Sequence, residues 1–131
     1  GSDNNYMITR YADALLMYGE ALVGSDQANE ALPFINMVRE RAGLKGLTPG
    51  QLDMEQILHE RRLELAFEGH RFFDLVRTGK AIEKISWALM TTVGFDDKIF
   101  TTEPIEAYQL LLPIPVGEIE KDASLVQNPG Y

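Results

Sequence analysis

The sequence predicts an all-α fold, made of tetratricopeptide-like helical hairpins, one long charged helix and an irregular C-terminal segment. Two observations carry this prediction. Apolar residues recur at intervals of three and four along most of residues 7–91, which is typical of amphipathic helices. From Thr92 onward this spacing fades, and Pro113 and Pro115 oppose a central strand. The composition, with 45% apolar and 24% charged residues in 131, is ordinary for one globular domain.

The first two predicted helices, residues 7–23 and 27–42, form a hairpin. Gly24 separates them and Gly43 ends the second. Together they span about 34 residues, the length of a tetratricopeptide repeat. The predicted buried positions follow helical spacing on each helix: Ile8, Tyr11, Ala12, Leu15, Gly19 and Leu22, then Ala28, Ala31, Leu32, Ile35, Val38 and Ala42.

A turn at residues 47–52 precedes a third helix, which we expect to run without interruption over residues 53–77. Thr78-Gly79 is a suitable stop for this helix. A shorter helix follows at residues 80–91. The remaining chain reads as a loop, a short extended segment and a terminal turn at residues 128–131.

The long helix carries a row of opposite charges between two apolar surfaces. On a continuous helix, Arg61–Glu64 and Glu68–Arg71 are pairs three residues apart, and Arg71–Asp74 extends the row. We therefore predict a largely enclosed structural charge network. Its members are Glu60, Arg61, Glu64, Glu68, Arg71 and Asp74. If the network is enclosed, removal of one partner costs about 3–5 kcal/mol because it strands a charge.

Catalytic and metal-binding interpretations of the same helix are weaker. Glu60, Glu64 and Glu68 lie one turn apart, as a glycosidase pair could, but flanking arginines oppose the protonated form that a general acid needs. His59 and His70 would lie about 16 Å apart on one helix, too far to share a metal. The sequence therefore predicts no catalytic residue, metal or cofactor.

Charge and hydropathy exclude two further classes. A net charge of −8 opposes nucleic-acid binding, which requires an excess of lysine and arginine. With no cysteine, the chain has no disulfide and no thiolate metal site. No apolar run approaches the ~20 residues of a membrane-spanning helix, so we expect no transmembrane segment in this chain.

Five segments, in order along the chain, together resemble the SusD/RagB family of Bacteroidetes outer-membrane proteins. They are "RYADALLMYGEAL" (10–22), "ALPFINMVRERAGL" (31–44), "ILHERRLELAFEGHRFFDLVRTGKA" (57–81), "LLPIPVGEI" (111–119) and "QNPGY" (127–131). The resemblance implies a non-catalytic cell-surface lipoprotein that binds glycans or other nutrients. It implies a SusC-like TonB-dependent transporter as partner and a location at the outer membrane. Because family members are several times longer, residues 1–131 resemble only the C-terminal part, and the lipid anchor would lie outside this chain.

The stretch 86–108 resembles no family motif, and it carries the candidate ligand contacts. Aromatic side chains stack on sugar rings and carboxylates accept hydrogen bonds from sugar hydroxyls. On this basis the candidates for binding a polysaccharide or oligosaccharide are Trp87, Asp96 and Asp97. The alternative is that Trp87 and Phe95 fill the core beneath a loop.

Two functions remain open from the sequence. The first is glycan binding at the cell surface. The second is a helical-repeat scaffold that binds a protein partner and has no direct glycan contact. Exposed aromatic residues within 86–108 would favour the first, and an exposed apolar groove along the first two helices would favour the second.

Overall fold

The computed structural model describes residues 8–92 and 103–131, which contain helices and turns but no strand. The predicted all-α class is therefore confirmed. The chain divides into two compact units, Gly1–Asp74 and Leu75–Tyr131. Within the described stretches, no helix combines the length and the apolar character needed to cross a membrane.

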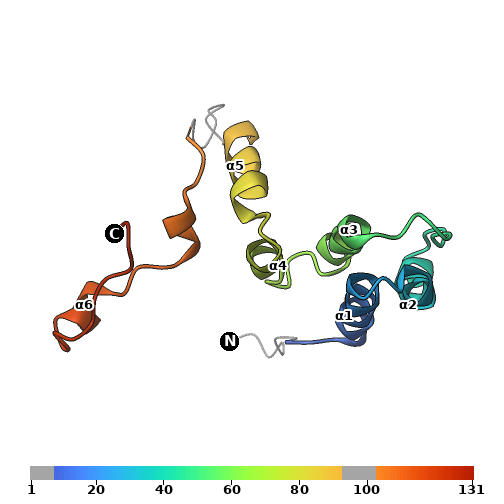
Figure 1. Ribbon diagram of the computed structural model, residues 1–131, viewed down its shortest axis with the longest axis horizontal. Coiled ribbons are helices and arrows are strands. Elements are labelled where there is room, and N and C mark those ends of the chain that lie inside the picture. The colour runs from blue at the N-terminus through green and yellow to red at the C-terminus, as the bar shows by residue number, and fades with distance from the viewer. Residues whose placement is uncertain (1–7, 93–102) are drawn as a thin grey trace, which may run out of the picture. The chain divides into compact units, whose positions relative to one another are not determined.

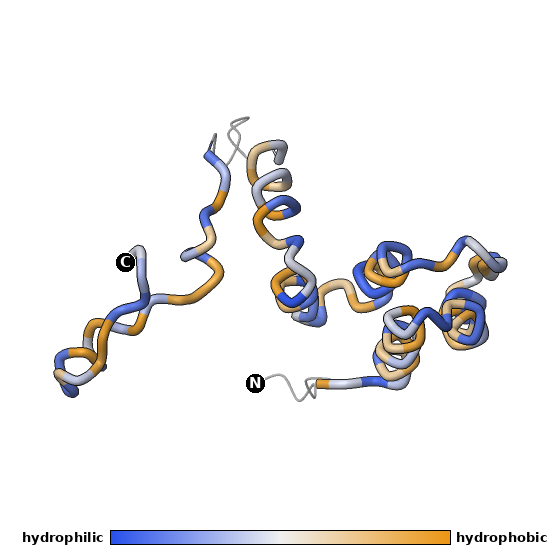
Figure 2. The backbone as a smooth tube through the Cα atoms, in the orientation of Figure 1, coloured by the Kyte–Doolittle hydropathy of each residue, from blue (hydrophilic) through white to orange (hydrophobic). Residues whose placement is uncertain are grey.

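The first unit is built on an antiparallel hairpin of α1 (Tyr11–Gly24) and α2 (Ala28–Arg41), against which α3 (Met54–Glu64) packs (Figure 1). Figure 2 shows apolar and polar residues interleaved along both helices of the hairpin, as amphipathic packing requires. The core between the three helices consists of Ala12, Leu15, Leu16, Ala31, Leu32, Ile35, Val38, Leu52, Ile57 and Leu65. Most of the predicted buried positions are thus confirmed, whereas Ile8, Tyr11 and Ala42 are exposed.

Gly19 sets the distance between the helices of the hairpin. A Cβ atom at this position would lie 2.5 Å from Cδ1 of Ile35, closer than van der Waals contact allows. The absence of a side chain at Gly19 therefore lets α1 approach the side chain of Ile35, which is completely buried.

Short polar interactions set the ends of the helices. Gly43 adopts φ +76°, and the amide of Leu44 donates to the carbonyl oxygen of Arg39 at 2.9 Å, which closes α2 in a Schellman motif. Asp53 begins α3, because its side chain accepts a hydrogen bond from the amide of Gln56 at 2.8 Å.

The prediction of one continuous helix over residues 53–77 is wrong. The structure has α3, a turn over residues 65–70 and a separate helix, α4 (Arg71–Arg77). In a continuous helix the carbonyl oxygen of Glu64 would accept from the amide of Glu68. Here Nη2 of Arg10 donates to that carbonyl oxygen, and the amide of Glu68 donates to Leu65 instead. Arg10, which is 54 residues away in sequence, therefore donates to the carbonyl oxygen that would have accepted the next hydrogen bond of a continuous helix.

The second unit contains α5 (Ala81–Thr91), a 3-10 helix η1 (Ala107–Leu110) and a single turn α6 (Val116–Ile119). Side chains hold its irregular C-terminal segment together. Gln127 donates to and accepts from the backbone of Ile114, at 2.9 and 2.8 Å. The hydroxyl of Tyr131 donates to the carbonyl oxygen of Leu111, and its ring packs edge-on against Tyr108. The predicted irregular segment is confirmed. The side-chain amide of Gln127 and the phenol of Tyr131 make hydrogen bonds to backbone groups that another strand would bond in a sheet.

Candidate functional site

Arg61 is the centre of a buried ionic cluster. Its side chain is 4% exposed and lies between two buried aspartates. Nη1 donates to Oδ1 of Asp13 in α1 at 2.8 Å, and Nε donates to Oδ2 of Asp74 in α4 at 2.9 Å. Charge-assisted hydrogen bonds of this length are strong. Arg61 therefore joins the first turn of α1, the last turn of α3 and α4.

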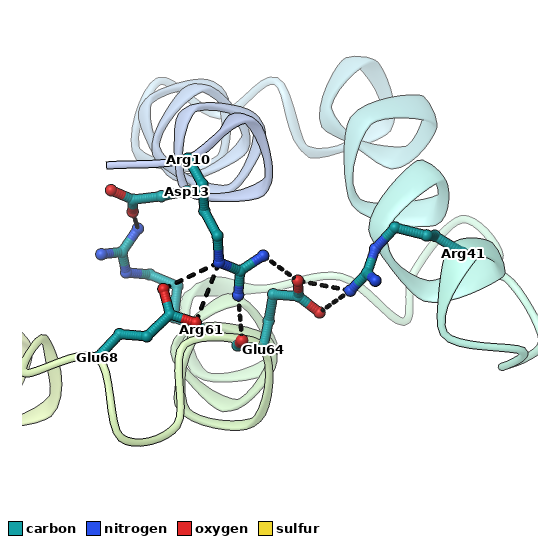
Figure 3. A network of polar contacts seen from close by, with 6 residues as sticks. All are labelled: Arg10, Asp13, Arg41, Arg61, Glu64 and Glu68. Carbon is teal, nitrogen blue, oxygen red and sulfur yellow. Dashed lines mark hydrogen bonds and ion pairs between the residues drawn. The ribbon is translucent and has the colours of Figure 1, made fainter. Parts of the chain in front are cut away.

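Arg10 forms a second cluster at the C-terminal end of α3 (Figure 3). Its Nε lies 2.9 Å from Oε2 of Glu68, and its Nη1 bonds the carboxylate of Glu64. Arg41 at the end of α2 donates to the same carboxylate at 2.6 Å. The hydrogen bond that Arg10 donates holds the pKa of Glu68 below its usual value, and the hydrogen bonds that Arg10 donates to Glu68 and then to Glu64 raise the pKa of Arg10.

Glu60 forms a third contact between α3 and α2. Its carboxylate is buried and accepts from Nη1 of Arg39, and Gln56 donates to it at 2.6 Å. Arg39 also donates from Nε to the carbonyl oxygen of Lys45 at 3.0 Å, which fixes the guanidinium. The charged face of α3 is thus paired mainly with α1 and α2.

The observed partners differ from those that helical spacing predicts. Arg61 bonds Asp13 and Asp74 rather than Glu64, and Glu68 bonds Arg10 rather than Arg71. Four partners were absent from the predicted network, namely Arg10, Asp13, Arg39 and Arg41. The sequence does contain a signal for these partners. Charged residues lie among the buried positions of the first two helices, in "RYAD" (10–13) and "RER" (39–41).

This arrangement opposes acid–base chemistry at the three glutamates. Glu60, Glu64 and Glu68 each accept a hydrogen bond from a guanidinium, so the carboxylate oxygens that acid–base chemistry would use are engaged in ion pairs. In the described part of the chain, no group of three histidine, aspartate or glutamate side chains is placed to hold a metal ion. The ionic clusters connect α1, α2, α3 and α4 to one another.

The candidate ligand residues lie in the second unit. Trp87 is on α5 with 68% of its surface exposed, so it does not fill the core of that unit. Asp96 and Asp97 lie outside the described residues, as does Phe95. Of the three, the structure therefore places Trp87 alone, as an exposed aromatic ring.

Comparison with known proteins identifies the class. A model of the SusD family matches residues 1–131, so the chain belongs to this family, as the sequence motifs predict. A SusD-like protein of Formosa agariphila is 42% identical over 62% of this chain and 18% of its own length. The starch-binding protein SusD of Bacteroides thetaiotaomicron is 28% identical over 98% of this chain and 22% of its own length.

Solved structures agree with this assignment. The surface glycan-binding protein A of Bacteroides thetaiotaomicron is 33% identical with a TM-score of 0.76, covering 97% of this chain and 25% of that protein. The surface glycan-binding protein A of Bacteroides uniformis is 36% identical with a TM-score of 0.75, and the match covers 95% of this chain and 28% of that protein. The chain thus spans about a quarter of the length of these relatives.

Proposed function

We propose that this chain is a non-catalytic part of a cell-surface glycan-binding protein, in which α1 to α4 form a rigid support and the region beginning at Trp87 contacts the glycan. The observation that carries the proposal is the SusD-family match over residues 1–131, together with the likeness to proteins named as surface glycan-binding proteins. The exposed ring of Trp87 supplies a stacking surface for a sugar, and Asp96 and Asp97 follow it closely in sequence.

The family also supports proposals on partner and location. We propose that the whole protein lies on the outer membrane of a bacterium, held there by a lipid anchor outside this chain. Its partner would be a SusC-like TonB-dependent transporter that imports the captured glycan. The arginine-bound glutamates of α3 support the non-catalytic part of this proposal, because Glu60 and Glu64 are engaged by Arg39 and Arg10 and are not presented as a free pair of carboxyl groups for glycoside hydrolysis.

A glycan array tests the proposal on this chain. We expect the chain to retain at least one oligosaccharide, and Trp87→Ala to weaken its binding by about fivefold or more, taking the about 1–3 kcal/mol that a nucleobase gains by stacking on an aromatic side chain as a guide. Phe73→Ala is the matched control, because Phe73 is an aromatic residue of similar exposure, at 70%. A folded chain that binds no glycan, or equal losses in both variants, would reject the proposed contact.

One observation favours the second function, a protein-binding scaffold. A pocket of about 450 Å³ lies along α1 and α2, and its apolar lining includes Leu15, Met37 and Val38. Met37 is 48% exposed, so an apolar side chain from a partner protein could pack against it. If a partner protein docks here, Met37→Asp abolishes copurification with it, whereas Met17→Asp, at 47% exposure and outside the pocket, leaves copurification intact. Equal copurification of both variants would reject this scaffold.

A further inference from the structure

A second pocket, of about 290 Å³, lies at the turn between α3 and α4. This volume is near the lower end of the range of about 300–1,000 Å³ for small-molecule sites, and it suits one monosaccharide unit. Its lining combines cationic and aromatic side chains, including Arg62, Phe67, His70, Arg71 and Phe72. Its lining shares no residue with that of the pocket along α1 and α2.

The pocket carries positive charge that the ionic clusters do not neutralise. Within residues 8–92 and 103–131, the structure gives Arg62 and Arg71 no hydrogen bond and no ion pair. Asp74, which also lines the pocket, is bonded by Arg61. Burial lowers the pKa of Arg71, the positive charge of Arg62 adds to this shift, and the negative charge of Asp74 opposes it. Two guanidinium groups are therefore close enough to repel each other at a pocket wall.

The backbone of the turn presents an aromatic ring beside these charges. Phe67 has φ +66°, a left-handed conformation that non-glycine residues rarely adopt. Its side chain is fully exposed, so among the described residues no apolar burial offsets the cost of this conformation. Backbone strain that does not serve packing is a feature of ligand-binding positions.

We propose that this pocket binds an anionic sugar unit, with its carboxylate or sulfate group on Arg62 and Arg71 and its ring against Phe67. The guanidinium fork matches the planar pair of oxygens of a carboxylate and two oxygens of a sulfate. The apolar face of a sugar ring stacks on an exposed aromatic side chain. This inference rests on the proposed glycan-binding function and adds to it the class of sugar: one bearing an acidic group.

Isothermal titration of the whole 131-residue chain tests the inference with three probes: a short oligogalacturonate, a sulfated galacto-oligosaccharide and a neutral malto-oligosaccharide. We expect an acidic probe to bind and Arg62→Gln/Arg71→Gln to weaken it by about tenfold or more, since two charge-assisted contacts are removed. Phe67→Ala weakens it about fivefold. The control Lys45→Gln/Lys121→Gln removes the same charge at exposed sites and leaves Kd unchanged. Arg62→Gln alone, at an exposed position of α3, serves if the double variant fails to fold.

Each outcome of this titration either supports or overturns the proposed acidic-sugar site. Loss of acidic-probe binding in the arginine and Phe67 variants, with the control intact, supports the site, and the preferred probe distinguishes carboxylate from sulfate. Equal binding by the variants and the control overturns it. Binding of the neutral probe without either acidic probe overturns the site but leaves the proposed function standing. A folded chain that binds none of the three probes overturns both.

Discussion

Replacement of Arg61 by leucine should destabilise the first unit severely. The variant removes the hydrogen bonds of 2.8 and 2.9 Å to Asp13 and Asp74, whose side chains are only 5% and 6% exposed. Water cannot replace the guanidinium there, so both carboxylates lose the charge-assisted hydrogen bond from Arg61. Breaking a buried pair in this way costs about 3–5 kcal/mol, a large share of a total stability of about 5–15 kcal/mol. At about 4 °C per kcal/mol for a small unit, the melting temperature falls by about 12 °C or more.

Thermal unfolding followed by circular dichroism measures this effect, with Arg62→Leu as the matched control. Arg62 is the next residue on α3 and is exposed, so its replacement should change stability by no more than about 0.5 kcal/mol. The triple variant Asp13→Asn/Arg61→Leu/Asp74→Asn removes both stranded charges and should recover much of the loss. Equal melting temperatures for Arg61→Leu and Arg62→Leu would refute the reasoning.

Three further predictions follow from single contacts. The pKa of Glu68 is lower in the folded state than in the unfolded state, so its contribution to stability is present above the unfolded-state pKa and is lost as pH falls through the folded-state pKa. The free energies of unfolding of the wild type and Glu68→Gln, measured by urea titration, should therefore converge in acid. A constant difference across that range would contradict this. Gly19→Ala should cost about 1–3 kcal/mol by overpacking against Ile35, and Ile35→Val, which removes Cδ1, should recover part of that cost in a double-mutant cycle. Additive losses would show that the two side chains do not meet. Gln127→Leu should speed amide hydrogen exchange at Ile114, whose N–H loses its acceptor, and unchanged exchange would contradict the proposed role of the amide.

Helical spacing predicts the hairpin well, because the buried face of each helix can be identified from the apolar residues of that helix alone. Leu15, Ile35 and Val38 are buried where the spacing places them. The stops at Gly43 and Gly79 are equally local, since both glycines adopt positive φ at the end of a helix.

Contacts between distant parts of the chain explain what the spacing misses. Nothing between residues 58 and 77 indicates that Arg10 donates to the carbonyl oxygen of Glu64, the residue at which α3 ends. For the same reason the charges of α3 look paired along one helix, whereas Asp13, Arg39 and Arg41 are their partners on α1 and α2. Spacing along a helix shows that charges are aligned, but not which tertiary partner binds each one.

A glycan array on this chain, with melting temperature and glycan integrity recorded together, tests most directly whether the chain is a non-catalytic glycan-binding protein. We predict that the folded chain retains an oligosaccharide, that Trp87→Ala reduces this binding without lowering the melting temperature, and that the recovered glycan is intact. A folded chain that retains no glycan would contradict glycan binding within these residues. A shortened glycan after incubation would contradict the non-catalytic assignment.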